Sequence, residues 1–230
     1  MPSRQDTRER LIETARQLFL QKGYTATGVA EILRQARLNA GSLYHFFPTK
    51  EDLLLAVLER YKELLGPLVL EPVFSRISDP MERVFGILDG YRRMLLTTNQ
   101  QQGCPIGNLA LELSTTHPAA RRIIAENFTA WRNAVANCLR QASGRLPARV
   151  DSDQLALFVL TVMEGAVMLA RAYHSITVYD AAVAQLRDYL DRLIVDGTHW
   201  TAPAQSARKS KQSKRKRSHL SKSFRRIRNT

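Results

Sequence analysis

The sequence predicts an all-α fold. Apolar residues recur at helical spacing along most of the 230 residues, and no segment alternates apolar and polar residues as a half-buried strand would. Glycine and proline fall between the periodic segments, where one helix ends and the next begins. With 44% hydrophobic residues the chain can bury a substantial core, so we expect a folded protein of one or two domains.

Two helices are predicted before residue 36. The first runs from about Arg4 to Gln21 and stops at Gly23, a residue type common just after helix ends. Thr27 is a suitable N-cap for a short second helix. A tight turn is then expected at residues 36–38.

A third helix is predicted to begin at Asn39, another good N-cap, and to end before Pro48. Thr49 followed by Asp52 resembles a capping box, which would open a longer helix to about Leu65. The first fifty residues or so therefore contain four elements in order: a basic helix, a short capped helix, a tight turn and an aromatic-rich helix.

The third helix has a composition suited to contact with another molecule. Leu43, Phe46 and Phe47 share one face, and small or polar residues occupy the rest of the helix. The outward residues are Ala40, Gly41, Ser42, Tyr44 and His45. Small residues let another surface approach, free N–H groups at a helix N-terminus suit phosphates, and hydroxyl and imidazole groups suit base edges. The pattern indicates a DNA recognition helix, with an ordinary helical hairpin as the alternative.

Three neighbouring residues complete the expected DNA-binding surface. The helix after Thr27 would cross the DNA backbone, as the first helix of a helix-turn-helix does. Asn39 would cap the recognition helix, and Lys50, at the start of the next helix, would lie near a phosphate.

Five more helices are predicted beyond Pro67, at about residues 80–97, 105–115, 119–142, 152–173 and 180–196. Helix 152–173 is apolar nearly all round, as a helix covered on two sides must be. The expected organisation is a DNA-binding domain at 1–50, a connecting helix at 50–65, a second helical domain at 66–200 and a tail at 201–230.

The positive charge is concentrated at the two ends of the chain. The net charge is +13, and residues 203–230 carry eleven Lys or Arg with no acid. Residues 1–50 carry eight bases and four acids, whereas residues 51–202 are close to neutral. The tail has the composition of a disordered segment and should attract a nucleic-acid backbone or an anionic membrane.

Several classes of protein are disfavoured. Cys104 and Cys138 are too few and too far apart for a disulfide framework, which indicates a reducing compartment. No signal-like segment opens the chain, and Thr161 and Glu164 interrupt its most apolar stretch. We expect a cytoplasmic protein without stable membrane insertion. The five histidines are scattered and no phosphate loop or nucleophile elbow is present, so neither an enzyme nor a metal or cofactor is expected.

The stretch GYTATGVAEILRQARLNAGSLYHFFPTKEDLL, residues 23–54, resembles the DNA-binding domain of TetR/AcrR-type transcriptional regulators. The resemblance lies in GY before a Thr, the V-x-x-I pattern, the G-S-L-Y-H-F run and the T-K-E that follows. It implies a homodimer whose two recognition helices reach successive major grooves of a roughly palindromic operator, about 34–36 Å apart. Arg37 stands where the family often has Gly, and Ala40 where a Lys commonly contacts phosphate. Arg37 is therefore a candidate for a replacement phosphate contact.

The resemblance also implies that the last two helices form a four-helix interface in a dimer. The alternative is that both helices belong to the core of one subunit. The residues expected at the interface are Leu155, Phe158, Val162, Leu169, Val183, Leu186, Leu190 and Leu193.

Cys104 is the candidate effector residue. It lies in QQGCPIGNLALEL, at the expected start of a helix, where the helix dipole would lower its pKa and raise its reactivity. The segment resembles a GC-x-x-G-N-L-A-x-E pattern in a branch of the family that includes sensors of electrophiles and oxidants. The alternative is that Cys104 is a small buried hydrophobic residue. Cys138 is expected to be such a residue as well.

The family likeness further implies a small-molecule pocket in the second domain. Aromatic and methionine residues suit an apolar ligand, although such residues are commonly core. The candidates are Phe85, Leu88, Tyr91, Leu109, Trp131, Met163, Met168 and Tyr173.

The expected function is that of a sequence-specific transcriptional regulator, and repression is favoured because blocking a promoter requires only occupancy. A small molecule or an electrophile would release it from double-stranded DNA. The alternative is a protein that binds nucleic acid or membrane without sequence preference through its basic tail.

Overall fold

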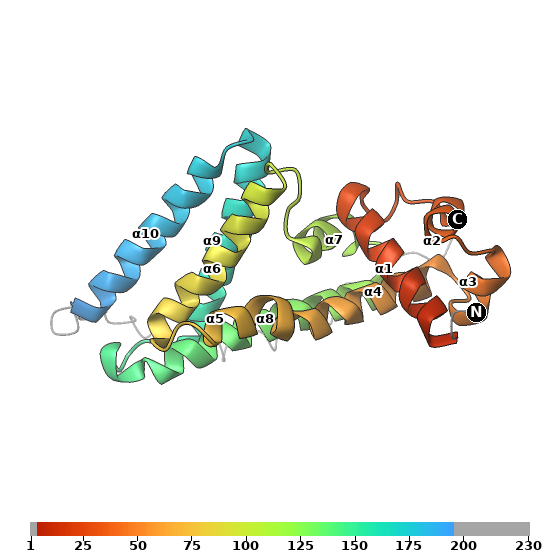
Figure 1. Ribbon diagram of the computed structural model, residues 1–230. Coiled ribbons are helices and arrows are strands. Elements are labelled where there is room, and N and C mark those ends of the chain that lie inside the picture. Colours follow the sequence, from red (N-terminus) through yellow and green to blue (C-terminus); the bar gives the residue numbers. More distant parts are fainter. Residues whose placement is uncertain (1–3, 196–230) are drawn as a thin grey trace, which may run out of the picture. The chain divides into compact units, whose positions relative to one another are not determined.

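The computed structural model describes residues 4–195, and these residues form helices and connecting turns without any strand (Figure 1). The predicted basic tail, 201–230, lies outside the described residues. The elements are α1 (Arg4–Lys22), α2 (Val29–Ala36), α3 (Ala40–Phe46), α4 (Lys50–Leu65), η1 (Gly66–Leu70), α5 (Glu71–Phe74), α6 (Pro80–Thr97), α7 (Pro105–Leu113), α8 (Pro118–Gln141), η2 (Ser143–Arg145), α9 (Ser152–Tyr173) and α10 (Ile176–Val195).

The predicted helix starts are confirmed where a side chain caps the backbone. Asn39 accepts a hydrogen bond from the Ser42 N–H at 2.9 Å and opens α3. Thr49 and Asp52 form the predicted capping box, with Asp52 N–H donating to Thr49 Oγ1 at 3.1 Å and Thr49 N–H to Asp52 Oδ2 at 2.9 Å. Both caps satisfy amide groups that have no partner within the helix.

The predicted N-cap role of Thr27 is wrong. Gly28 occupies the N-cap position of α2 and makes no side-chain cap bond. The Thr27 side chain is completely buried, and its hydroxyl donates to the carbonyl of Gly23 at 2.7 Å. Thr27 therefore holds the turn between α1 and α2 closed.

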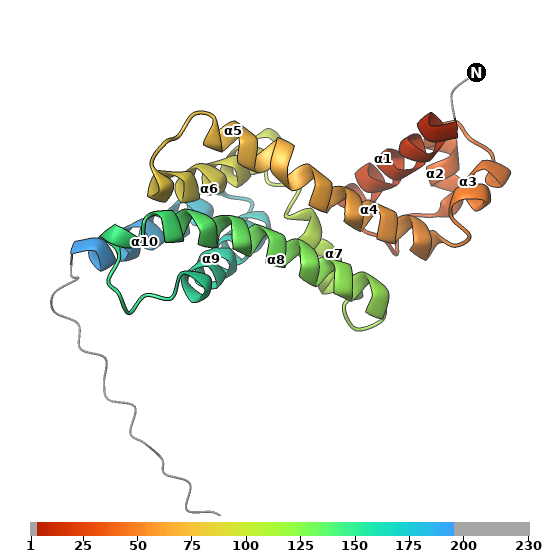
Figure 2. The same cartoon turned by 90° about the horizontal axis from the view of Figure 1, so that it is seen from below.

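Helices α1 to α4 share one part of the core. Leu11, Ile32, Leu43, Phe47 and Leu54 are buried there, as their helical spacing predicts. Helix α4 also lies along α8, as Figure 2 shows. Asn127 on α8 donates to the carbonyl oxygens of Leu58 and Ile123 at 3.1 and 2.9 Å, so a buried polar residue joins α4 to α8.

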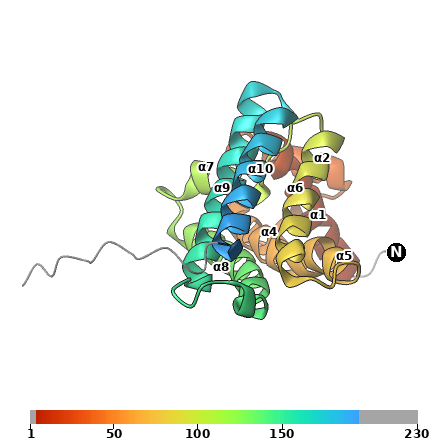
Figure 3. The same ribbon diagram turned by 90° about the vertical axis from the view of Figure 1, so that its left-hand side faces the viewer.

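Helices α6, α8, α9 and α10 enclose the rest of the core. Helix α9 packs most extensively on α8 and α10, and Figure 3 shows α9 and α10 side by side. Tyr179 on α10 is buried and donates its hydroxyl to the Leu88 carbonyl at 2.7 Å. By length and composition alone, helix α9 could cross a membrane, but the core helix of a soluble protein can have the same length and composition. Its packing against three other helices explains its composition.

Candidate DNA-binding surface and effector pocket

Most of the predicted DNA-binding residues are exposed along α3 and the turn before it. Asn39, Ala40, Gly41 and His45 are exposed, and 54% of Tyr44 is accessible. Ser42 is partly buried, and its hydroxyl donates to Asn39 Oδ1 at 3.1 Å. The backbone therefore presents tyrosine and histidine groups, flanked by small residues, on one short helix.

Arg37 is exposed and ends α2 in the left-handed conformation, with φ of 52°. That conformation favours glycine. An arginine there keeps a cationic side chain in the turn that precedes α3.

Two residues of the predicted DNA-binding surface, Thr27 and Lys50, bond to the protein's own backbone instead. Thr27 is fully buried, so the structure contradicts a DNA contact by its side chain. The Lys50 ammonium donates to the Tyr24 carbonyl at 2.6 Å and lies 4.0 Å from the centroid of the Tyr24 ring. Burial lowers the pKa of Lys50, partly offset by the charge of Glu112. Lys50 thus ties the start of α4 to the turn after α1.

Two arginines outside the predicted site lie against the aromatic residues at the end of α3, and a third is exposed on α2. The Arg4 and Arg8 guanidinium groups lie over the rings of Phe46 and Phe47, at 5.9 and 5.5 Å from the ring centroids. Arg34 is exposed in the last turn of α2. Their spacing in the sequence gives no signal, because the fold alone brings α1 beside α3.

A cavity of about 410 Å³ lies among α1, α4, η1, α5, α6, α7, α8 and α9. Its lining is mostly apolar, with a small number of polar groups, as is typical of small-molecule sites. The lining residues used below are Arg16, Tyr61, Tyr91, Arg93, Cys104, Phe128, Trp131 and Glu164.

Two of the residues predicted to line a pocket, Tyr91 and Trp131, lie in the wall of this cavity. Leu109 and Met163 are buried in the core, whereas Met168 and Tyr173 are 53% and 69% exposed. The remaining two candidates, Phe85 and Leu88, line a separate depression between α6 and α10. The other six candidates lie outside this cavity, because helical spacing shows which residues share a face but not which part of the fold that face meets.

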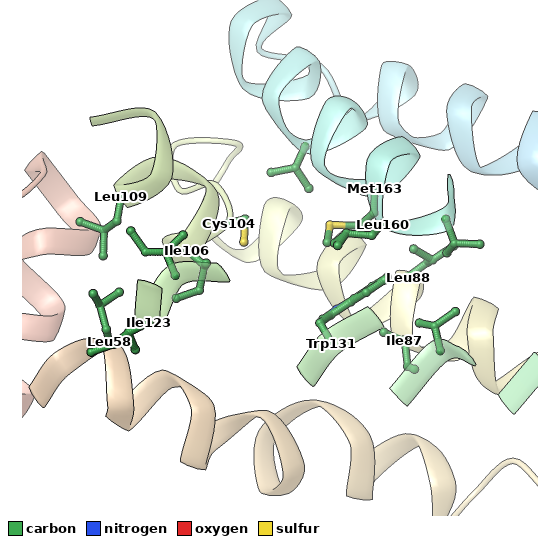
Figure 4. Packing of buried hydrophobic residues seen from close by; sticks show 14 of the residues in the cluster. Leu58, Ile87, Leu88, Cys104, Ile106, Leu109, Ile123, Trp131, Leu160 and Met163 are labelled. Atoms are coloured by element: carbon green, nitrogen blue, oxygen red, sulfur yellow. The ribbon is translucent and has the colours of Figure 1, made fainter. Parts of the chain in front are cut away.

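Cys104 lies in the wall of the cavity and is buried. Figure 4 shows it with Ile106 and Leu109 on one side and Trp131, Leu160 and Met163 on the other. Its sulfur accepts a hydrogen bond from the Gly107 N–H at 3.4 Å, at the start of α7.

The predicted lowering of the Cys104 pKa is wrong. Burial raises the pKa of the Cys104 thiol well above its usual value, and the neighbouring Glu164 carboxyl raises it further. Hydrogen bonds from the backbone of Gly107 and Ile106 act in the opposite direction and are outweighed. Cys138 lies on α8 and is buried, and burial raises its pKa as well.

Helix α7 joins the cavity to the DNA-binding helices. Its first residues, Pro105 and Ile106, line the cavity. In its last turn, the Glu112 carboxylate accepts hydrogen bonds from the backbone N–H groups of Tyr24 and Thr25 at 3.0 and 2.6 Å. A movement of α7 in the cavity would therefore pull on the turn that precedes α2.

The predicted interface residues divide into three groups. Leu155, Leu186 and Leu190 are buried within the subunit, so the structure contradicts an intersubunit role for their side chains. Val162, Val183 and Leu193 are partly buried, and Phe158 and Leu169 are 44% and 42% exposed. Further large apolar residues are exposed on the same two helices: Leu157, Met168, Tyr173 and Tyr189.

Within residues 4–195, no three His, Cys, Asp or Glu side chains lie close enough to hold a metal ion.

Comparison with known proteins gives consistent matches. Residues 11–57 match the bacterial regulatory proteins of the tetR family, and residues 80–186 match the tetracyclin repressor-like C-terminal domain. The chain is 30% identical to the uncharacterized HTH-type transcriptional regulator YxaF of Bacillus subtilis over 171 residues, which cover 74% of this chain and 87% of YxaF.

The chain also resembles NemR of Escherichia coli, an HTH-type transcriptional repressor. The two are 35% identical over 109 residues, which cover 47% of this chain and 53% of NemR. The crystal structure of NemR in its reduced form matches with a TM-score of 0.70 and 28% identity, covering 80% of this chain and 96% of that one.

Proposed function

Because the chain belongs to the tetR family and is a transcriptional regulator, we propose that it is a homodimeric repressor of a roughly palindromic operator. A small molecule or an electrophile in the cavity at α7 releases it from the DNA. The observation that carries this proposal is that α7 lines the cavity at one end and holds the turn before α2 at the other.

The recognition helix is α3. Tyr44 and His45 offer hydrogen-bonding groups to base edges, while Ala40 and Gly41 allow a close approach. Arg37 contacts phosphate and sets the position of the helix without adding sequence information.

The dimer forms through α9 and α10. Exposed apolar side chains on both helices support this surface, and Phe158 already contacts Tyr189 edge to face, with ring centroids 5.5 Å apart. Two recognition helices are required because a single one reads too few base pairs for useful specificity.

Filling of the cavity shifts α7, and Glu112 passes this shift to the turn before α2. Reaction of Cys104 with an electrophile is a second way to fill the same space, supported by its place in the cavity wall. The raised pKa of its thiol leaves little thiolate, so the reaction is slow unless the electrophile is first held in the cavity. We place this regulator in the cytoplasm, where DNA and effector are both available.

Binding to the DNA upstream of the protein's own gene tests this function, against shuffled DNA at about 150 mM salt, where nonspecific contacts weaken. Wild type, Tyr44→Ala, Cys104→Ser and a truncation after Ala202 are compared, each with and without a mild electrophile. Specific binding should survive truncation, fall with Tyr44→Ala and be released by the electrophile only when Cys104 is present. Nonspecific binding that vanishes with the eleven basic residues of the tail would favour the alternative function.

A further inference from the structure

Glu164 is an acid in the wall of a mostly apolar cavity. It lies on α9, whose buried residues are otherwise apolar. One carboxylate oxygen, Oε1, is buried and has no hydrogen-bond partner among the described residues. A buried carboxylate without a cation beside it is destabilising, so proteins normally pair it.

The fold makes room for this carboxyl group. A Cβ atom on Gly107 would lie only 2.3 Å from Glu164 Oε2, so a side chain at residue 107 would displace the acid. The absence of a side chain at the start of α7 thus lets the carboxyl group sit against that helix, next to Cys104.

The cavity supplies no cation for Glu164. Its two arginines already have acidic partners: Arg16 bonds Glu13 at 2.6 and 2.8 Å, and Arg93 pairs with Asp89. The pKa of Glu164 is raised by burial, with only a hydrogen bond from Cys104 opposing the rise. No basic residue in the described part of the chain therefore offsets its charge.

Aromatic side chains surround the rest of the cavity. Tyr61, Tyr91, Phe128 and Trp131 line it, and the rings of Tyr91 and Trp131 meet edge to face at 6.3 Å. Ring faces attract cations. Tyr61 Oη and Trp131 Nε1 are further buried polar groups in this lining, beside the side chains of Arg16 and Tyr91 respectively.

We propose that the cavity takes a protonated amine with an apolar body. The ammonium group donates to Glu164 Oε1, and the aromatic residues enclose the apolar part. The volume, about 410 Å³, lies near the lower end of the range for small-molecule sites, which favours a compact ligand. This inference rests on the proposed function only in using the same cavity.

Binding of a matched pair of probes tests the inference. The probes are 4-phenylbutylamine and 4-phenylbutan-1-ol, which differ in the charged group but hardly in size. The chain has two tryptophans, Trp131 and Trp200, so the full-length Trp200→Phe protein reports binding through Trp131 alone. In this background the amine should bind at least tenfold more tightly than the alcohol, a difference of about 1.4 kcal/mol.

Glu164→Gln should abolish the preference for the amine while changing the affinity for the alcohol less than about threefold. Glu126→Gln is the matched control, because Glu126 is an exposed acid on α8 that pairs with Lys62 away from the cavity. It should leave both affinities unchanged. Circular dichroism verifies that each variant is folded.

Three outcomes would overturn the inference. These are equal binding of the two probes to wild type, a preference for the amine that survives Glu164→Gln, and no binding of the amine below about 1 mM. These outcomes are separate from the proposed function, because the fluorescence readout contains no DNA. An amine that binds as expected but leaves the operator complex intact would refute effector-driven release and leave the ligand class standing. If an electrophile releases the DNA but the cavity shows no preference for the amine, the ligand class is refuted and the proposed function stands.

Discussion

Removal of the Glu112 carboxylate should weaken the attachment of α7 to the turn before α2. Glu112→Ala deletes the acceptor for the Tyr24 and Thr25 amides, at 3.0 and 2.6 Å. A hydrogen bond to a charged group contributes about 1.5–3 kcal/mol. Because the Thr25 bond is exposed and water can replace its acceptor, we expect a total loss of about 1–2 kcal/mol in the free energy of unfolding. At this chain length that loss lowers Tm by roughly 2–8 °C.

Urea denaturation followed by circular dichroism measures the loss. Glu112→Gln keeps one acceptor oxygen and should lose less than Glu112→Ala. Glu63→Ala is the control, since Glu63 is exposed and pairs with Arg60 on the surface, and it should stay within about 0.5 kcal/mol of wild type. A Glu112→Ala protein as stable as this control would refute the reasoning.

The stabilisation by Glu112 should also depend on pH. Burial alone would raise the pKa of Glu112, but the hydrogen bonds from Thr25 and Tyr24 and the charge of Lys50 outweigh it, so the pKa lies below its ordinary value. Such a group stabilises the fold fully above its unfolded pKa, about 4.3, and the contribution is lost as pH falls through the folded pKa. The difference in stability between wild type and Glu112→Gln should therefore shrink below about pH 4. A constant difference would contradict this assignment.

Three further substitutions test other parts of the structure. Gly107→Ala places a methyl group 2.3 Å from Glu164 Oε2, and we expect a loss of about 1–3 kcal/mol in stability and a weaker preference for the amine probe, measured by denaturation and fluorescence. Tyr179→Phe removes a buried hydroxyl bond of 2.7 Å to α6, which should lower stability by about 1–2 kcal/mol in urea denaturation; no change would contradict its role in joining α10 to α6. Leu169→Asp should dissociate the dimer in sedimentation experiments without unfolding the subunit, because Leu169 is 42% exposed, whereas Leu111→Asp, at a residue 80% exposed on α7, should not.

Local sequence patterns predict the helices and several of their ends. Periodic apolar residues and local capping are properties of short segments, so they could be read without knowing the fold. The Asn39 cap, the capping box at Thr49 and Asp52, and the exposed face of α3 all belong to this class. The family motif lies within the same segments.

Which surface covers each residue depends on contacts between segments that lie far apart in the sequence. Thr27 and Lys50 turn to the backbone of residues 23 and 24, because the turn after α1 brings those carbonyl groups within reach. Leu155, Leu186 and Leu190 are covered by helices of the same subunit. An apolar stripe shows that a face needs a partner, but it does not identify the partner.

The cavity depended entirely on tertiary packing. Residues from seven α-helices and η1 meet there, and their positions in the sequence range from Arg16 to Glu164. In the sequence Glu164 only interrupts an apolar segment, and the place of Cys104 at a helix start predicts a lowered pKa. Burial beside the Glu164 carboxyl reverses the direction of that shift, since desolvation of the thiolate outweighs two hydrogen bonds from α7.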